Sequence, residues 1–335
     1  MAKRPETKDE TQKKASIYLD ADFILERNKE IVPTTPAVDS ILCGGVPEGL
    51  LMLITGPEKL GKTSLALTII RNAQRMGKIG IIVDAEHRLR KKILTGIEGL
   101  DISPEKLKII RSTEGNILSA EQLLERAEQS LQDFPRSVLL IDSFSALCPA
   151  VEQAASYDDS VQMAARAKLE AKFFRKIAPI VSINGNIVIG IAHVASNIGT
   201  PGTSENIGKK AQYGLDIKVK CKKPFLKNDK VEPEWYSGDT QIGHRIIWEC
   251  PTNAIGAGGG SSVGYLRYGH GLDDVAEIID AACELGIIKE GGAGWKELPN
   301  GKKIQGWENM YDFLSQEENK EVLNEIEKSY RELIQ

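Results

Sequence analysis

The sequence has no long hydrophobic run and few cysteines. Hydrophobic residues fill 41% of its 335 positions and charged residues 27%, yet no apolar stretch approaches the roughly 18 residues that a membrane-spanning helix needs. The five cysteines include no CxxC pair, which argues against a disulfide framework or a zinc site and for a reducing compartment. The charged first 15 residues contain no apolar core, so we expect no secretory signal. These absences exclude an integral membrane protein and predict a cytoplasmic one with no membrane partner.

A strong excess of charge of either sign is also missing. The 43 Lys and Arg residues against 47 Asp and Glu give a formal net charge of −4. Nucleic-acid binding would therefore need a local basic surface, because the overall field is weakly acidic. Residues 206–230 offer such a surface, with eight lysines and two acids. A solvated hairpin would explain this lysine-rich segment equally well.

Short apolar runs alternate with longer amphipathic stretches through the first two thirds of the chain. The predicted strands cover 50–55, 79–84, 137–142 and 186–192, and the predicted helices cover 62–76, 118–132 and 160–181. Strands separated by helices indicate an α/β fold with a mainly parallel central sheet and helices on both faces. The segment 195–211 is rich in Gly, Ser, Thr and Asn, so we expect it to be mobile or ordered only by a ligand.

A phosphate-binding motif lies between the first predicted strand and the first predicted helix. The run GPEKLGKTS fits GxxxxGK[ST] in the strand–loop–helix context that this motif requires. Glycines would let backbone N–H groups face a β-phosphate at the helix N-terminus. Lys62 would pair with the β- and γ-phosphates, and the Thr63 hydroxyl would ligate Mg²⁺. The predicted nucleotide-binding residues are Gly56, Pro57, Glu58, Lys59, Leu60, Gly61, Lys62, Thr63 and Ser64. The alternative is an ordinary glycine turn that opens a helix.

Polar residues end the other predicted strands. Asp142 follows the run VLLI, at the rim where open α/β sheets bind ligands, and is placed to hold Mg²⁺ through a water. Asp84 and Glu86 end another strand, and Glu86 is predicted to be the catalytic group that orients and deprotonates water. His193 ends IVIGIAH, where it could sense the γ-phosphate of the nucleotide. Each residue also has an ordinary explanation, as a loop acid, a surface acid in a turn or a packed histidine.

In this order and spacing, the motifs resemble the RecA family of ATP-dependent recombinases. The resemblance is carried by GPEKLGKTS, DAEH at 84–87 and LLIDSFSAL at 139–147. The run AARAKLEAKFFRKIAP at 164–179 and the histidine in IAHV are similar to the phage UvsX-like branch. The run GGAGWKELPNGKKIQGWENMYDFL is similar to a RecA-type C-terminal domain. The resemblance spans about 33–330, nearly the whole chain.

The resemblance implies a RecA-like P-loop NTPase core over 33–270. A tail and short oligomerisation arm at 1–32 would precede this core, and a small α/β C-terminal domain at 271–335 would follow it. It implies a DNA-dependent ATPase, with ATP and Mg²⁺ as cofactors, that forms homo-oligomeric helical filaments on single-stranded DNA. Such a protein promotes pairing and strand exchange with homologous duplex DNA in recombination and repair. The setting would be bacterial or phage-infected host cytoplasm, with room for mediator and single-strand-binding proteins as partners.

The resemblance also assigns roles to residues. Lys62 and Thr63 take the nucleotide and Mg²⁺ roles, and Glu86 activates water. Asp142 is the second acidic site, and also a metal-binding one, and His193 is the γ-phosphate switch. The implied DNA-binding parts are the loops at about 151–163 and 195–211 and the residues Arg166, Asn206, Gly208, Lys209 and Lys210. Lys289, Lys296, Lys302 and Lys303 of the C-terminal domain could gather duplex DNA or be merely solvated.

Two stretches depart from the family pattern. Cellular RecA proteins cap the γ-phosphate with a lysine pair from the adjacent subunit, but the corresponding stretch 250–254 has no lysine, so Arg267 and Lys210 become candidates for this cation. The run RLRKKI at 88–93 replaces the usual adenine-contacting positions and leaves base selectivity open. Two other functions therefore stay open: a RecA-fold ATPase motor or ring, and an ATP-binding DNA-coating protein with weak or no hydrolysis.

Overall fold

The computed structural model describes residues 29–156, 164–196, 203–225, 229, 231–256 and 258–334. Most of the predicted N-terminal tail and arm lies outside these ranges, as do positions 157–163 and 197–202 of the two predicted DNA loops. Within the described ranges, no helix is long and apolar enough to cross a bilayer.

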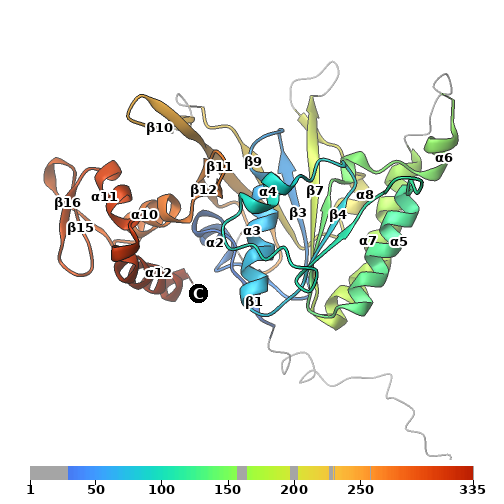
Figure 1. The fold of residues 1–335 in the computed structure, drawn as a ribbon, viewed down its shortest axis with the longest axis horizontal. Helices are drawn as coiled ribbons and strands as arrows, with labels where there is room; N and C mark the ends of the chain where they lie inside the picture. The colour runs from blue at the N-terminus through green and yellow to red at the C-terminus, as the bar shows by residue number, and fades with distance from the viewer. Residues whose placement is uncertain are drawn as a thin grey trace, which may run out of the picture.

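A large central sheet organises the chain (Figure 1), with its strands in the order β13-β12-β11-β9-β3-β7-β6-β4-β5. The parallel part consists of β9 (Ile217–Lys222), β3 (Leu51–Gly56), β7 (Ile187–Ser196), β6 (Val138–Asp142), β4 (Gly80–Asp84) and β5 (Leu107–Ile110). The antiparallel part consists of β11 (Thr240–Asn253), β12 (Ser261–Arg267) and β13 (Gly271–Leu272), with β10 (Glu234–Ser237) paired to β11. The predicted α/β class with a mainly parallel core sheet is confirmed.

Helices cover both faces of the parallel strands (Figure 1). On one face, α2 (Pro36–Leu42) and α3 (Lys62–Arg75) pack against a core that includes Met52 and Ile54 of β3. On the other, α5 (Ala120–Asp133) and α7 (Ala164–Asn184) pack against a core that includes Leu51 and Leu53. Successive residues of β3 thus face opposite sides, as the two-residue period of a strand requires. The remaining core elements are β1 (Ile31–Val32), β2 (Val46–Pro47), α4 (Lys91–Thr95), η1 (Phe144–Ala146) and α6 (Ala150–Ala154).

The polar segment 195–211 is more regular than its composition predicts. Strand β8 (Thr203–Glu205) pairs with the end of β7, and α8 (Lys209–Gln212) follows it. Ile207 and Ala211 are buried in the core beside α7. The Glu170 carboxylate of α7 accepts a hydrogen bond from the Gly208 N–H at 2.7 Å. The expectation that only a ligand would order this segment is wrong for its described residues, because packing against β7 and α7 already positions them.

The end of the chain forms a small α/β unit with a core of its own. Its elements are α10 (Asp274–Glu284), β14 (Lys289–Glu290), η2 (Gly292–Gly294), β15 (Trp295–Glu297), β16 (Lys303–Gln305), α11 (Trp307–Leu314), η3 (Glu317–Asn319) and α12 (Lys320–Ile334). The three strands make an antiparallel sheet. Ile278, Met310 and Ile326 are fully buried in the core of this unit.

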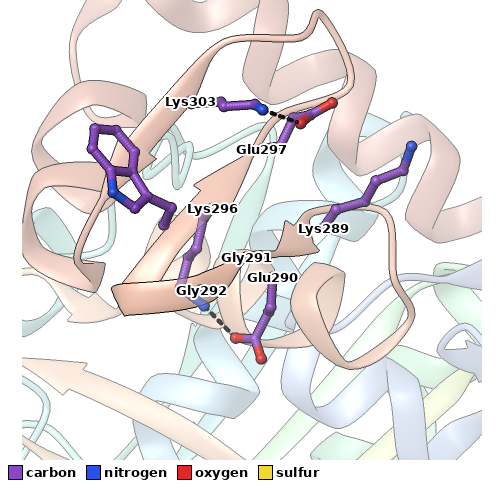
Figure 2. A pocket seen from close by; sticks show the side chains of 8 residues that line it. Lys289, Glu290, Gly291, Gly292, Lys296, Glu297 and Lys303 are labelled. Carbon is purple, nitrogen blue, oxygen red and sulfur yellow. Dashed lines mark hydrogen bonds and ion pairs between the residues drawn. The ribbon is translucent and has the colours of Figure 1, made fainter.

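Two of the lysines considered for duplex DNA are paired with acids on this small sheet. Figure 2 shows Lys296 beside Glu290, at 2.5 Å, and Lys303 beside Glu297, at 3.3 Å. In both pairs, the acid offsets the charge that its lysine offers to a phosphate backbone. The small sheet therefore presents less free positive charge than the number of its lysines indicates.

Buried polar contacts hold the C-terminal unit to the core. The Tyr330 hydroxyl of α12 donates to the Pro36 carbonyl at 2.5 Å, and Glu277 of α10 accepts from the Ala37 N–H at 3.0 Å. Glu277 is almost fully buried, and this burial raises its pKa to about 8. Both contacts end at the start of α2, so α10 and α12 are fixed to the helix that opens the core.

Candidate active site

The loop between β3 and α3 curves tightly around the start of α3. Gly56 and Gly61 have φ angles of 145° and 74°, a region that favours glycine. A Cβ on Gly56 would lie 2.3 Å from the Cys221 Sγ and 2.5 Å from the Cys221 carbonyl oxygen. The β9 strand thus packs directly under the loop and leaves no room for a side chain at Gly56. Glycine at this position therefore allows the tight curve of the loop that a phosphate-binding motif has.

The side chain of Lys62 lies inside the curve of this loop. Its Nζ donates to the carbonyl oxygens of Gly56, at 2.9 Å, and Pro57, at 2.6 Å, and the residue is only 5% exposed. Burial lowers the pKa of Lys62, while Cys221 and the nearby carboxylates oppose this effect. A cation on the inner side of the loop, at the N-terminus of a 14-residue helix, fits the terminal phosphates of a nucleotide.

Thr63 and Asp142 form an oxygen pair beside the loop. The Thr63 hydroxyl, on the first turn of α3, donates to Asp142 Oδ2 at the end of β6, at 2.9 Å. Burial raises the pKa of Asp142 to about 6, although the hydrogen bond from Thr63 opposes the rise. A hydroxyl and a carboxylate are ligands that Mg²⁺ prefers, usually together with phosphate oxygens and water. Among the described residues, no group of three His, Cys, Asp or Glu side chains could hold a metal ion by itself.

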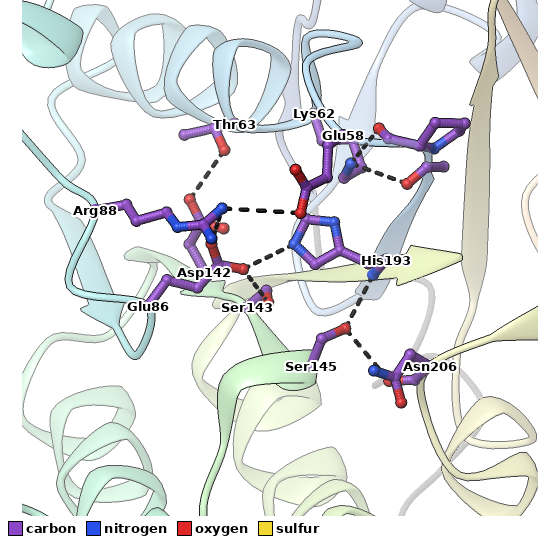
Figure 3. Close-up of polar contacts among 12 residues, drawn as sticks. Glu58, Lys62, Thr63, Glu86, Arg88, Asp142, Ser143, Ser145, His193 and Asn206 are labelled. Carbon is purple, nitrogen blue, oxygen red and sulfur yellow. Dashed lines mark hydrogen bonds and ion pairs between the residues drawn. The ribbon is translucent and has the colours of Figure 1, made fainter. Parts of the chain in front are cut away.

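Both carboxylate oxygens of Glu86 contact neighbouring side chains at the carboxyl edge of the sheet (Figure 3). Its Oε1 accepts from the Ser143 hydroxyl at 2.5 Å and lies 2.8 Å from Nε2 of His193, the residue of β7 paired with Gly56. Its Oε2 lies 3.4 Å from the Arg88 guanidinium. Burial alone would raise the pKa of Glu86, but these hydrogen bonds and the charges of His193 and Arg88 outweigh it and lower the pKa. The carboxylate is thus ionised at neutral pH, as a base for water must be.

A second set of contacts joins His193 to the segment before α8. The Asn206 N–H donates to the His193 carbonyl at 2.8 Å, and the His193 N–H donates to the Ser145 hydroxyl at 3.0 Å. The Arg166 guanidinium donates to the Ser145 carbonyl at 3.2 Å and to the side-chain oxygen of Asn206. Arg166 also pairs with Glu170 at 3.3 Å. These contacts form a continuous polar connection from Glu86 to the start of α8.

The structure brings together the predicted residues that end different strands. Lys62, Thr63, Asp142, Glu86 and His193 lie in one cluster (Figure 3). Three of the other predicted loop residues, Pro57, Glu58 and Lys59, are exposed and form the crest of the loop. Leu60 is buried, and Ser64 is half-buried in the first turn of α3. Asp84, the other acid considered for water, instead pairs with Arg111 at 3.1 Å.

The predicted DNA-binding residues divide into two groups. Arg166, Asn206 and Gly208 make the internal contacts described above, whereas Lys209 and Lys210 are exposed on α8. Sequence reasoning missed Ser143 and Ser145, although they are the first and third residues after Asp142 in LLIDSFSAL. Arg267, a candidate cation for the γ-phosphate, lies 3.2 Å from the Tyr311 hydroxyl at the C-terminal unit.

Together, the fold and this site define a P-loop NTPase with a RecA-like sheet. The family model described as RecA N-terminal domain matches residues 15–223. Protein RecA of Caldanaerobacter subterraneus subsp. tengcongensis is 31% identical over 311 residues, covering 91% of this chain and 85% of that protein. Protein RecA of Geobacter sulfurreducens is 32% identical over 321 residues, covering 94% and 88%. Protein RecA of Bifidobacterium longum is 29% identical over 309 residues, covering 90% and 72%.

The chain belongs to the RecA family. Members of this family are DNA-dependent ATPases that use ATP with Mg²⁺, bind single-stranded DNA and form homo-oligomeric filaments in DNA recombination and repair. The predictions of a RecA-type recombinase, of DNA-dependent ATPase activity and of the two cofactors are confirmed at the level of the family.

Proposed function

We propose that this recombinase binds and hydrolyses ATP at the loop that holds Lys62. Lys62 would bind the β- and γ-phosphates, the Thr63 hydroxyl would ligate Mg²⁺, and Asp142 would hold a water on the metal. Bound ATP supplies the phosphoanhydride bond whose cleavage changes the state of the protein. The observation that carries this proposal is the convergence of an ammonium, a hydroxyl and two carboxylates from three chain segments beside one phosphate loop.

Glu86 would orient the attacking water and accept its proton. Ser143 and His193 engage Oε1, so Oε2 is the oxygen that would face water. The lowered pKa of Glu86 keeps it in the base form. His193 touches Glu86 with its ring and the Asn206 segment with its backbone. We infer that His193 transmits the state of the γ-phosphate to this segment, which is a coupling of two binding equilibria.

The exposed surface of α8 is the DNA contact that we propose. Lys209 and Lys210 are exposed there. Together with Lys168 and Arg175 of α7, they line a groove between the two helices. Arg166, Asn206 and Gly208 would shape this surface through their internal contacts and also approach the DNA backbone. The described parts of the predicted loops are 151–156, 195–196 and 203–211, and the last of these includes Lys209 and Lys210. Basic side chains and backbone N–H groups bind phosphates without reading sequence.

The proposal also covers the roles of the domains, the assembly of the chain and its branch of the family. Residues 33–270 would act as the ATPase core, 271–335 as the C-terminal domain, and the arm within 1–32 as an oligomerisation element. The chain would form helical filaments and promote exchange with homologous duplex DNA, with mediator and single-strand-binding proteins as helpers. Its segments 164–179 and IAHV support a place in the phage UvsX-like branch, and therefore activity in bacterial or phage-infected cytoplasm.

The test is an ATPase assay of the full chain with increasing single-stranded DNA, followed by electron microscopy of the same mixture. Stimulation of turnover by DNA together with helical filaments is the expected result. DNA-stimulated turnover with closed rings would instead support a motor. Filaments or DNA binding without turnover would support a DNA-coating protein.

Neutralising the lysine pair of α8 is expected to weaken DNA binding whatever the base sequence. Each lost phosphate contact lowers the dependence of log K on log salt by about 0.7 for a single strand, so Lys209→Gln with Lys210→Gln should flatten the slope by about 1.4. Fluorescence anisotropy with labelled oligonucleotides at several salt concentrations measures the slope. The matched control is Lys91→Gln with Lys92→Gln, an adjacent exposed pair on α4. An unchanged slope in the α8 variant would remove these lysines from the DNA contact.

A further inference from the structure

Arg88 bridges the end of β4 and the crest of the phosphate loop. Its backbone N–H donates to Asp84 Oδ1 at 3.2 Å. Its guanidinium NH1 lies 3.4 Å from Glu86 Oε2 and 3.9 Å from Glu58 Oε1. Figure 3 shows the guanidinium of this side chain pointing toward the carboxylate of Glu58. The side chain is 70% exposed, so a ligand can reach it.

The two ion pairs of Arg88 do not account for its placement as a stabilising contact. Ion pairs of a solvent-exposed guanidinium contribute little to stability, and neither carboxylate meets the guanidinium in the bidentate geometry that makes such pairs strong. Glu58 is itself 61% exposed on the loop crest. The pairs are therefore weak enough to be exchanged for a better anion.

The position of Arg88 also conflicts with the role of Glu86. Oε1 of Glu86 is engaged by Ser143 and His193, and Oε2 faces the guanidinium of Arg88. A water that is to lose its proton to Glu86 must reach Oε2, the same oxygen. Arg88 must move away from Oε2 before Glu86 can serve as a base.

A terminal phosphate on a bound nucleotide would attract the Arg88 guanidinium and draw it away from Glu86. Its charge exceeds that of a carboxylate, and its oxygens match the fork of a guanidinium. Lys62 supplies positive charge from inside the loop, whereas Arg88 lies on the outer side, over the crest. A phosphate chain held by the loop would therefore end between these two cations.

We propose that Arg88 is a γ-phosphate-binding residue supplied by the same chain. When the triphosphate binds, Arg88 exchanges its contacts with Glu86 and Glu58 for the γ-phosphate. This exchange frees Oε2 of Glu86 for water. This inference rests on the proposed ATP site. It gives the site a built-in distinction between nucleoside triphosphate and diphosphate, because only the triphosphate offers the group that draws Arg88 away.

The test compares the affinity of the full chain for ADP and for the non-hydrolysable analogue AMP-PNP, each with Mg²⁺, by isothermal titration calorimetry. Arg88→Ala should leave ADP affinity within about twofold and weaken AMP-PNP binding roughly tenfold, as expected for one charged hydrogen bond. Arg88→Lys should recover part of the loss, because it restores charge without the fork. ATP turnover at saturating nucleotide should also fall in Arg88→Ala.

Arg126→Ala is the matched control, since Arg126 is an exposed arginine on α5, outside the run 88–93 that replaces the adenine-contacting positions. It should bind both nucleotides like the unaltered chain. Equal losses for ADP and AMP-PNP in Arg88→Ala, or no loss for either, would overturn the inference. The Lys62→Ala variant separates this outcome from failure of the site itself: if Lys62→Ala loses both nucleotides while Arg88→Ala loses neither, the ATP site stands and Arg88 is only a surface ion pair.

Discussion

Lys62→Ala is expected to abolish nucleotide binding and turnover. The ammonium is the cation that the loop encloses, with two carbonyl contacts within 3 Å and almost no solvent exposure. Removing it takes away the principal counter-charge of two phosphate groups, and charged hydrogen bonds of this kind contribute about 1.5–3 kcal/mol each. We therefore expect affinity for ADP and AMP-PNP to fall by roughly 100-fold or more. Titration calorimetry with Mg²⁺ measures the loss directly.

The control for this prediction is Lys59→Gln, an exposed lysine on the crest of the same loop. It should retain nucleotide binding within a few-fold, because the loop positions are predicted to bind phosphate through their backbone N–H groups and the side chain of Lys59 is exposed. Thermal unfolding of both variants shows whether the fold is kept, since Lys62→Ala leaves the carbonyls of Gly56 and Pro57 without this partner. A folded Lys62→Ala protein that still turns over ATP would remove the site assignment.

The positions of the principal site residues could be predicted from the sequence, because they depend on two local rules. The spacing GxxxxGK[ST] after a strand places Lys62 and Thr63 at a helix start. The carboxyl ends of parallel strands meet at one edge of a sheet, so Asp142, Glu86 and His193 were expected to converge without knowledge of strand order. The structure brings these residues together through hydrogen bonds.

The contacts that orient these residues depend on tertiary structure and could not be predicted. Ser143 reaches Glu86 because β6 and β4 are adjacent, which alternating strands and helices do not specify. The direction of the Arg88 side chain depends on where the loop crest lies after folding. The order of the segment before α8 depends on Glu170, a buried carboxylate on a distant helix. Composition alone predicted a segment that is mobile or ordered only by a ligand, because composition does not show that Glu170 contacts it.

Glu86→Gln is expected to keep nucleotide and DNA binding and to slow hydrolysis by about 10²-fold or more. Glutamine has nearly the same shape, and its carbonyl oxygen can still accept from Ser143 and His193. It cannot accept the proton of a water, whereas the carboxylate, with its lowered pKa, stays in the base form at neutral pH. Phosphate release in the presence of single-stranded DNA measures the rate, and anisotropy with AMP-PNP measures DNA binding.

The discriminating variant is Asp84→Asn, the acid that ends the same strand. Asp84 is paired with Arg111 at 3.1 Å and accepts the Arg88 N–H, so it already serves to position the turn after β4. We expect Asp84→Asn to slow turnover far less than Glu86→Gln does. The reverse order of effects, or equal turnover in Glu86→Gln, would transfer the proton-accepting role to another group. In the proposed coupling, DNA binding with AMP-PNP needs the γ-phosphate but not its cleavage. A Glu86→Gln protein that is slow in hydrolysis and normal in DNA affinity would therefore separate the proposed switch at His193 from the chemistry at Glu86, two functions that meet at one hydrogen bond.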